Sequence, residues 1–150
     1  GPGGHGLVVK GAFDIWVLQS SGVQHYNGSE WALTALPSSQ LQSIAGAGLG
    51  DLASMWLVGY DGYAFHWAGG SWTTHTWKGT GEAPHLVQVA IDASGDAEVL
   101  SLDGRRFTLT QTGTWTEIKV PWGIIPSNLF IDGEGTVWLT GPDGYLATEH

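Results

Sequence analysis

The sequence predicts an all-β protein built from repeated four-stranded sheets, and three observations lead to that prediction. Short runs of apolar and β-branched residues are separated by glycine-rich breaks, and 24 glycines stand among 150 residues. Tryptophan recurs at a nearly constant interval along the chain. No segment shows a sustained apolar period of 3.6, so helix should be nearly absent. Four imperfect units of about 41 residues are typical of β-propeller blades, and a four-bladed β-propeller is the predicted fold class.

Two series of anchor residues define the length of the repeat. Trp16, Trp56, Val99 and Trp138 are 40, 43 and 39 residues apart, and Trp31, Trp72 and Trp115 are 41 and 43 residues apart. These intervals lie in the range of known propeller blades. One such sheet cannot bury both of its faces alone, so successive blades should stack face to face. The repeated tryptophans are the natural filling between blades.

The four units place the blades at about 7–36, 41–77, 86–120 and 129–150 of a single domain that covers residues 1–150. A short turn separates the second and third strand of each unit. The turn residues are Ser21-Gly22, Asp61-Gly62, Asp103-Gly104 and Asp143-Gly144. Asp-Gly is favoured where both turn residues need positive φ, so tight hairpins are expected.

The fourth unit has only three strands, because the sequence stops where its outer strand is expected. The six residues before Leu7 are too few to supply that strand. The unpaired sheet edge would be a template for another chain. Three explanations remain open: the chain is part of a longer propeller, it closes by oligomerising, or it is a four-bladed monomer with an incomplete last blade.

Charge and composition exclude several classes of partner. Five basic residues against 14 acidic ones give a formal charge of −9, so a phosphate backbone would be repelled and nucleic acid is not an expected partner. No apolar run is long enough to predict membrane insertion. The chain has no cysteine, which removes disulfides and thiolate chemistry. Localisation stays open, with an extracellular or cell-surface position favoured.

Standard catalytic and metal-binding motifs are not found in the sequence. It contains no GxSxG elbow, HExxH pair, P-loop or EF-hand loop, so we expect no enzyme, no cofactor and no metal site. His25 and His66 recur at equivalent blade positions beside Tyr26 and Trp67. Structural packing is the favoured interpretation of these histidines, and a repeated weak ligand site is the alternative.

One face of the predicted propeller gathers the candidate ligand-binding residues. An antiparallel sheet reverses at every turn, so the hairpins between second and third strands and the connections between blades should emerge on the same face. The candidates on that face are Asp61, Tyr63, Glu82, His85, Asp103, Trp122, Asp143 and Tyr145. Trp122 has no counterpart in the other copies and is the aromatic residue least explained by packing. An exposed aromatic ring beside carboxylates suits a sugar, although turn preference alone would also explain each aspartate.

The repeat resembles a known type of propeller. An innermost Val/Ile-rich strand is followed by a Gly-x-Val-Trp-Leu pattern, then Asp-Gly-aromatic, then Gly-x-Trp, and this succession over residues 7–150 resembles the tectonin and tachylectin repeat. It also resembles bacterial propeller repeats rich in Trp, Gly and His. The first resemblance implies recognition of carbohydrate without catalysis, and the second implies adhesion, sensing or protein contact. Fucose-lectin propellers use an arginine in each site, whereas this chain has only Arg105 and Arg106.

The sequence therefore predicts a non-catalytic ligand-recognition module, and the resemblance to tectonin-type repeats implies a lectin-like module that binds carbohydrate. The alternative is a protein-interaction or scaffold propeller that closes by oligomerising or belongs to a longer propeller. The expected partner is a glycan or a protein, and a homo-oligomer that completes the propeller is a further possibility.

Overall fold

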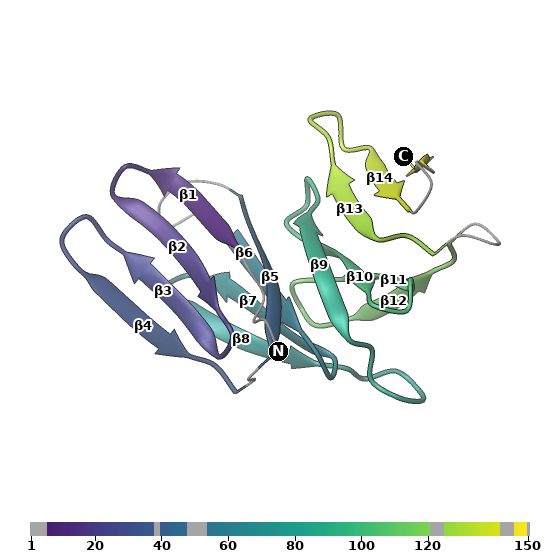
Figure 1. Ribbon diagram of the computed structural model, residues 1–150, viewed down its shortest axis with the longest axis horizontal. Helices are drawn as coiled ribbons and strands as arrows, with labels where there is room; N and C mark the ends of the chain where they lie inside the picture. Colours follow the sequence, from purple (N-terminus) through teal and green to yellow (C-terminus); the bar gives the residue numbers. More distant parts are fainter. Residues whose placement is uncertain (1–5, 38–39, 48–53, 121–124, 142–145, 150) are drawn as a thin grey trace.

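The computed structural model describes residues 6–37, 40–47, 54–120, 125–141 and 146–149, and within these ranges it contains strands and no helix. The strands form four antiparallel sheets arranged as the blades of a fan (Figure 1). The described residues accordingly include no helix that is long and apolar enough to cross a membrane. The predicted all-β fold with four blades is confirmed.

Each blade is a sheet whose strands are neighbours in chain order. Blade 1 contains β1 (Leu7–Gly11), β2 (Asp14–Gln19), β3 (Gly22–Tyr26) and β4 (Trp31–Ala35). Blade 2 contains β5 (Leu41–Ala47), β6 (Ser54–Gly59), β7 (Tyr63–Ala68) and β8 (Ser71–Thr76). Blade 3 contains β9 (Leu86–Ile91), β10 (Ala97–Ser101), β11 (Arg106–Leu109) and β12 (Trp115–Ile118). Blade 4 contains β13 (Asn128–Ile131), β14 (Val137–Thr140) and β15 (Leu146–Glu149). Among the described residues blade 4 thus has three strands where the others have four, as predicted.

The tight hairpin predicted from Asp-Gly forms in blade 2 but not in blade 3. Asp61 and Gly62 have φ of 58° and 70°, so this pair makes the two-residue turn with positive φ at both positions. In blade 3 only Gly104 is left-handed, with φ of 87°, and its amide donates to the carbonyl of Ser101 at 3.0 Å. The blade 3 loop is longer, so Asp103 keeps an ordinary backbone conformation.

The other two predicted turns have different outcomes. In blade 1, Gly22 pairs with Gln19, so the turn residues are Ser20 and Ser21 rather than Ser21 and Gly22. The Asp143-Gly144 turn of blade 4 lies outside the described residues. The second-to-third-strand connection is therefore a recurring feature whose backbone varies from blade to blade.

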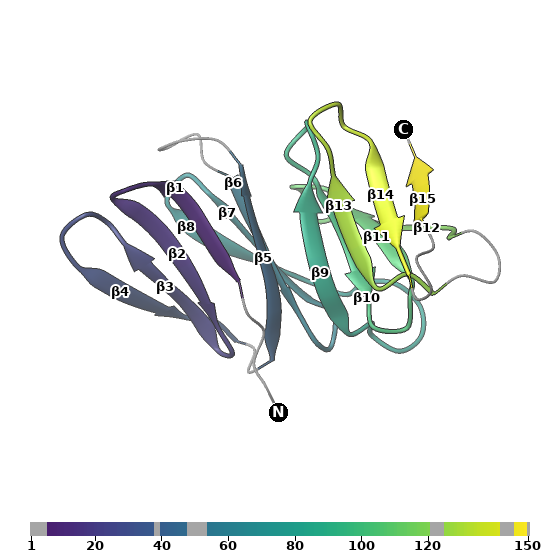
Figure 2. The ribbon, with the colours of Figure 1, turned by 45° about the horizontal axis from the view of Figure 1, so that its top comes forward.

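Three apolar clusters lie between consecutive blades, and the blades stack in chain order along the arc (Figure 2). The cluster between blades 1 and 2 is centred on Trp16, Met55 and Phe65. The cluster between blades 2 and 3 contains Trp56 and Phe107. A smaller group of Leu100, Leu129, Val137 and Leu139 joins blades 3 and 4. Alternation along each strand explains this arrangement, because successive side chains point to opposite faces and both faces of an inner blade are covered.

The second strand of each blade carries the residue that enters the next interface. Trp16 pairs with His25, and Trp56 pairs with His66, on the faces directed at blades 2 and 3. In blade 3 the equivalent residue of the second strand is Glu98. It pairs with Ala90 of the first strand, just as Trp56 pairs with Ala45 in blade 2. Val99, the anchor chosen from the sequence, points the other way. The repeat alignment was therefore one residue out of register in blade 3. Because successive side chains of a strand point to opposite faces, this shift assigned the anchor to the wrong face of the sheet.

The prediction that tryptophans fill the spaces between blades is confirmed for blades 2 and 3. Trp72 lies 6.2 Å from Trp16 in an edge-on contact. Trp115 likewise meets Trp77 at 5.4 Å between ring centroids, with the planes at 81°. Both geometries are preferred for aromatic pairs. Trp31 is at the same repeat position in blade 1 but is 50% exposed, because blade 1 is the end of the arc.

Candidate functional site

The hairpins of blades 2 and 3 meet the chain segment that connects these two blades. The amide of Gly62 donates to the carbonyl of Pro84 at 2.8 Å, and the amide of Leu102 donates to the carbonyl of His85 at 2.7 Å. The amide of Asp61 donates to His85 Nδ1 at 3.2 Å. The two hairpins and the connection therefore emerge on one face, as the topology predicts.

A cavity of about 320 Å³ opens at this meeting point. It is lined by Glu82, Ala83, Pro84, His85, Leu102, Asp103 and Arg105. We call this feature the hairpin cleft. A second hollow of about 370 Å³ shares Arg105 and follows the end of β12 and the residues after it. It is lined by Gly104, Arg105, Glu117, Ile118, Lys119 and Val120. Arg105 therefore lines both cavities, next to the hairpin of blade 3.

Asp103 and Arg105 form an ion pair at the mouth of the hairpin cleft. Arg105 Nε lies 3.0 Å from Asp103 Oδ2, and the guanidinium carbon lies 5.4 Å from the centroid of the Phe107 ring. Burial alone would raise the pKa of Asp103. The hydrogen bond from the Ser101 hydroxyl and the charge and hydrogen bonds of Arg105 outweigh that effect, so the pKa lies below its usual range. Asp103 is consequently a carboxylate at neutral pH and keeps Arg105 in place.

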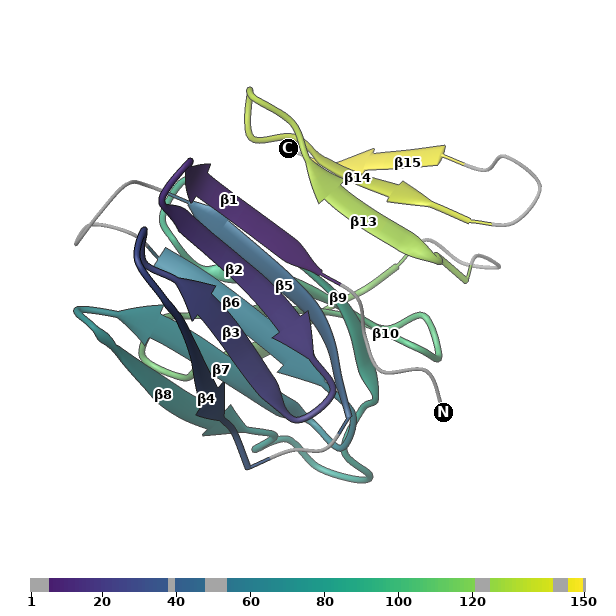
Figure 3. The ribbon, with the colours of Figure 1, turned by 60° about the vertical axis from the view of Figure 1, so that its left-hand side comes forward.

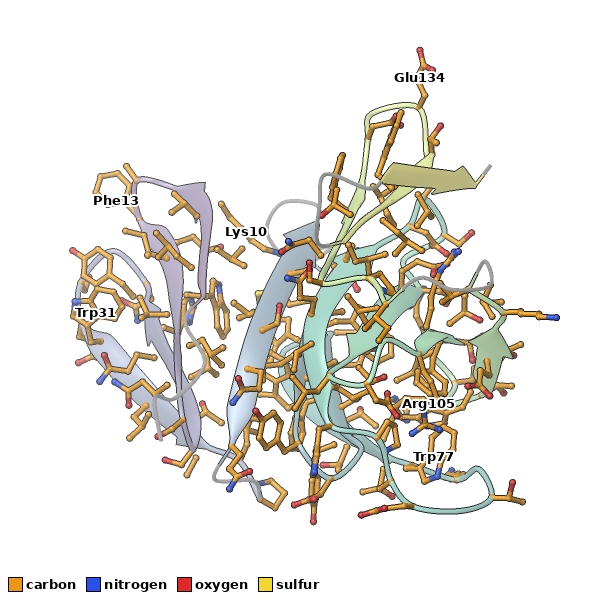
Figure 4. The ribbon with its side chains drawn as sticks, turned by 45° about the vertical axis from the view of Figure 1, so that its right-hand side comes forward. Lys10, Phe13, Trp31, Trp77, Arg105 and Glu134 are labelled. Carbon is orange, nitrogen blue, oxygen red and sulfur yellow. The ribbon has the colours of Figure 1, made fainter. Side chains whose placement is uncertain are left out.

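His85 links the blade 2 hairpin to the cleft. Its Nδ1 lies 3.5 Å from the carboxylate of Asp61, and its ring lies 4.6 Å from that of Tyr60. The side chains of Asp61 and His85 are 71% and 43% exposed, so both remain accessible to a ligand. Figure 4 shows Arg105 and Trp77 at this end of the molecule, where both side chains adjoin Phe107.

The structure brings four of the eight sequence-predicted residues together. Glu82, His85 and Asp103 line the hairpin cleft, and Asp61 joins it through His85. Tyr63 lies elsewhere, because its ring stacks 6.0 Å from Phe65 against the core between blades 1 and 2. The other three predicted residues, Trp122, Asp143 and Tyr145, lie outside the described residues.

Sequence reasoning missed four residues that line the cleft, Ala83, Pro84, Leu102 and Arg105, and the last two bear most on ligand binding. Arg105 was considered only as evidence against a fucose site, although it is one of two arginines and follows the Asp103-Gly104 turn directly. Leu102 is 60% exposed, which its apolar side chain does not suggest. The backbone of Ser101 pairs with that of Arg105, so the loop has three residues, and a loop of this length projects side chains that a two-residue turn does not. Within the described residues no group of three His, Asp or Glu side chains is placed to hold a metal ion.

Comparison with known proteins identifies the type of fold. No protein-family description and no curated protein matches the sequence. A streptogramin B lyase structure matches with a TM-score of 0.72 at 16% identity, covering 99% of this chain and 54% of that chain. YCF48 bound to D1 peptide gives 0.69 at 16% identity, with 97% and 50% covered. BBS1N in complex with ARL6DN gives 0.74 at 16% identity, with 95% and 49% covered.

These matches show that the chain has a β-propeller fold. At such identity the likeness shows the fold alone. The chain spans about half the length of each of these three chains. A propeller repeat is therefore supported in general, while the tectonin-type resemblance stays a prediction.

The prediction that the chain is not an enzyme is overturned by the same comparison. One of the matching propellers is a lyase, so this fold supports catalysis. The inference had rested on the absence of standard catalytic motifs. Those motifs belong to other folds, and a propeller can assemble reacting groups from separate loops that share no local sequence pattern.

Proposed function

We propose that the chain is a ligand-recognition module whose hairpin cleft binds a peptide or protein segment through a basic side chain. The observation that carries the proposal is the charge of the cleft. Glu82, Asp61 and Asp103 supply three carboxylates around it, and Asp103 is paired with the cation of Arg105. The balance is negative, in a chain whose formal charge is −9. Such a site attracts and orients a cation.

The shape of the site suits an extended segment. Leu102, which is 60% exposed, offers an apolar contact beside the carboxylates. Arg105 lines both the hairpin cleft and the second hollow, so the two lie next to each other. An apolar contact flanked by charges is a common arrangement in peptide recognition. The matching propellers YCF48, bound to a peptide, and BBS1N, in complex with ARL6DN, support a protein partner by analogy of fold.

Carbohydrate is the second candidate, and one observation favours it. The ring centroids of Tyr60 and His85 are 4.6 Å apart, and His85 lies beside the carboxylate of Asp61. An aromatic surface therefore adjoins hydrogen-bond acceptors. A sugar ring stacks its C–H face on such a surface. Recognition of this kind would match the tectonin-type resemblance of the repeat.

The two candidates are distinguished by arrays of short basic peptides, the same peptides with Lys and Arg replaced by Gln, and neutral oligosaccharides. The double variant Asp61→Asn, Glu82→Gln should weaken binding of basic peptides by roughly threefold to tenfold, since each exposed charge pair contributes about 0.2–1 kcal/mol. High salt should weaken it further. Glu134→Gln removes an exposed charge far from the cleft, in the turn where Figure 4 labels Glu134, and should leave binding unchanged.

Each result has a definite meaning. Binding to oligosaccharides that ignores salt and is lost in Tyr60→Ala would favour the sugar and overturn the peptide proposal. Equal binding to basic peptides and to their Gln counterparts would also overturn it, because charge would then play no part in recognition.

A further inference from the structure

Blade 1 lies at one end of the arc, and Figure 3 shows the backbone of its outer sheet face. Within the described residues this face is exposed and largely apolar. Strand pairing places Leu7 opposite Val17 and Val9 opposite Ile15 on this face. Tyr26 opposite Trp31 and Gln24 opposite Leu33 continue it across β3 and β4. Leu7, Val9, Trp31 and Leu33 are 61%, 59%, 50% and 59% exposed. We call this the receiving face. Exposed apolar surface of this extent indicates an interaction site.

The repeat shows what normally covers such a face. Trp72 in blade 2 and Trp115 in blade 3 stand at the position of Trp31, and each is packed against a tryptophan of the preceding blade, Trp16 or Trp77. Within the described residues no blade packs on Trp31, whose ring lies 5.2 Å from that of Tyr26 in its own sheet. The receiving face is therefore one half of an inter-blade interface.

Blade 4 carries the complementary half at the other end of the arc. Pairing of Phe130 with Trp138 places both on the face directed away from blade 3, where their rings stack 6.1 Å apart. Phe130 is 47% exposed. Trp138 occupies the repeat position of Trp16, and the indole N–H of each donates to an aspartate, Asp132 at 2.8 Å and Asp14 at 2.7 Å. We call this the donating face.

We infer that the donating face of blade 4 packs on the receiving face of blade 1 of a second copy of the chain. In this contact Trp138 of one copy would pack against Trp31 of the other. The pair would repeat the contact that Trp16 makes with Trp72 between blades 1 and 2. The contact joins different surfaces, so a pair of copies makes it twice and closes into one ring. Eight blades lie within the known range of propellers. The inference is independent of the proposed function of the hairpin cleft.

A second copy is the occupant that the observations favour. The two end faces extend the interface already formed between blades 1 and 2, so each copy carries the surface that the other lacks. The chain also spans 54%, 50% and 49% of three matching propellers, so two copies reach the size of one complete ring of that kind. Since each copy has a formal charge of −9, moderate salt should strengthen association by screening repulsion.

The first test is the solution mass of the unmodified chain, measured by light scattering across a concentration series. We expect a species of twice 15.9 kDa that becomes more populated at moderate salt. A mass of 15.9 kDa at every concentration and salt would overturn the inference, and further blades on the same polypeptide would then be the occupant to seek. This measurement needs no variant.

The second test separates head-to-tail contact from other pairings. Leu33→Asp damages only the receiving face, and Phe130→Asp damages only the donating face. Each variant alone should associate at least tenfold more weakly than the unmodified chain, because every contact it makes includes one damaged face. An equimolar mixture should regain a heterodimer through the one contact in which both faces are intact.

Matched controls make the second test decisive. Ile125→Asp introduces the same charge at a position that is 64% exposed and belongs to neither end face, so dimer formation should persist. If Phe130→Asp alone dimerised as the unmodified chain does, contact of two receiving faces would be the true arrangement and the head-to-tail inference would be wrong. Failure of the mixture to form a heterodimer would also overturn it.

Discussion

The interfaces on the two sides of blade 3 use different chemistry at the same structural position. Between blades 2 and 3, Trp56 is fully buried, stacks on His66 at 4.4 Å and donates its indole N–H to the carbonyl of Gly95 at 2.9 Å. Between blades 3 and 4, Glu98 holds that position and pairs with Arg106 at 2.9 Å. The side chains of Arg106 and Glu98 are only 5% and 8% exposed.

This difference shows how much the blade backbone tolerates. Strand pairing is the same in both blades, so the geometry of the sheet does not depend on which side chain enters the next interface. An aromatic residue gains stability directly by burying apolar surface. A buried ion pair gains little relative to apolar residues of the same volume, but each charge becomes costly when its partner is removed. The two interfaces should therefore respond differently to substitution.

The largest effect is expected at the ion pair. Arg106→Met leaves the carboxylate of Glu98 buried without its guanidinium partner and should lower the free energy of unfolding by about 3–5 kcal/mol. Urea unfolding measures this loss. The double variant Glu98→Leu, Arg106→Met should recover most of it, because no buried charge remains. If the double variant were as unstable as the single one, packing rather than charge would govern this interface.

A smaller loss is expected at the tryptophan. Trp56→Phe keeps a ring between blades 2 and 3 but removes the hydrogen bond to Gly95 and part of the ring volume. The cost should be roughly 1–3 kcal/mol, from about 1 kcal/mol for the bond and the remainder for the cavity. The same unfolding measurement applies at protein concentrations too low for two copies to associate, with Trp31→Phe on the receiving face, which is 50% exposed in the single chain, as the matched control. An equal loss in the control would contradict the assignment of the effect to burial.

The smallest effect is expected from pH and concerns only the aromatic interface. Burial lowers the pKa of His66 below 6.5, His75 lowers it further and Asp96 partly opposes both. Burial and the charge of Lys78 lower the pKa of His75. Because both folded-state values lie below the unfolded one, the stability that the neutral imidazoles contribute is complete above pH 6.5 and decreases as the pH falls below it.

Unfolding midpoints between pH 7.5 and pH 5 test this expectation. A decrease should appear in the unmodified chain and should become shallower in His75→Phe, which cannot be protonated. His85→Gln, in the exposed hairpin cleft, is the control and should retain the full decrease. A pH dependence that is unchanged in His75→Phe would rule out this histidine as its source.

Sequence reasoning located the candidate site in part, and the physical reason is topological. Alternating strand direction was enough to place Asp61, Glu82, His85 and Asp103 on one face. It did not place Tyr63, because the side-chain direction at the end of a strand depends on register, and this ring turns into the core. Register also explains the error at Val99. Blade 3 has Glu98 at the position that tryptophan occupies in the other blades, so the repeat offered no aromatic residue by which to align it.

The sequence by itself determined the strands, the length of the repeat and the number of blades, because these depend on local alternation, turn residues and spacing. Tertiary structure alone decided which faces became interfaces and which remained open. The ion pair of Glu98 and Arg106 comes from two strands of one sheet, and Trp31 is exposed because no blade covers it within the described residues. Burial depends on neighbours that are distant in the chain, so equal residues at equal repeat positions acquire different roles.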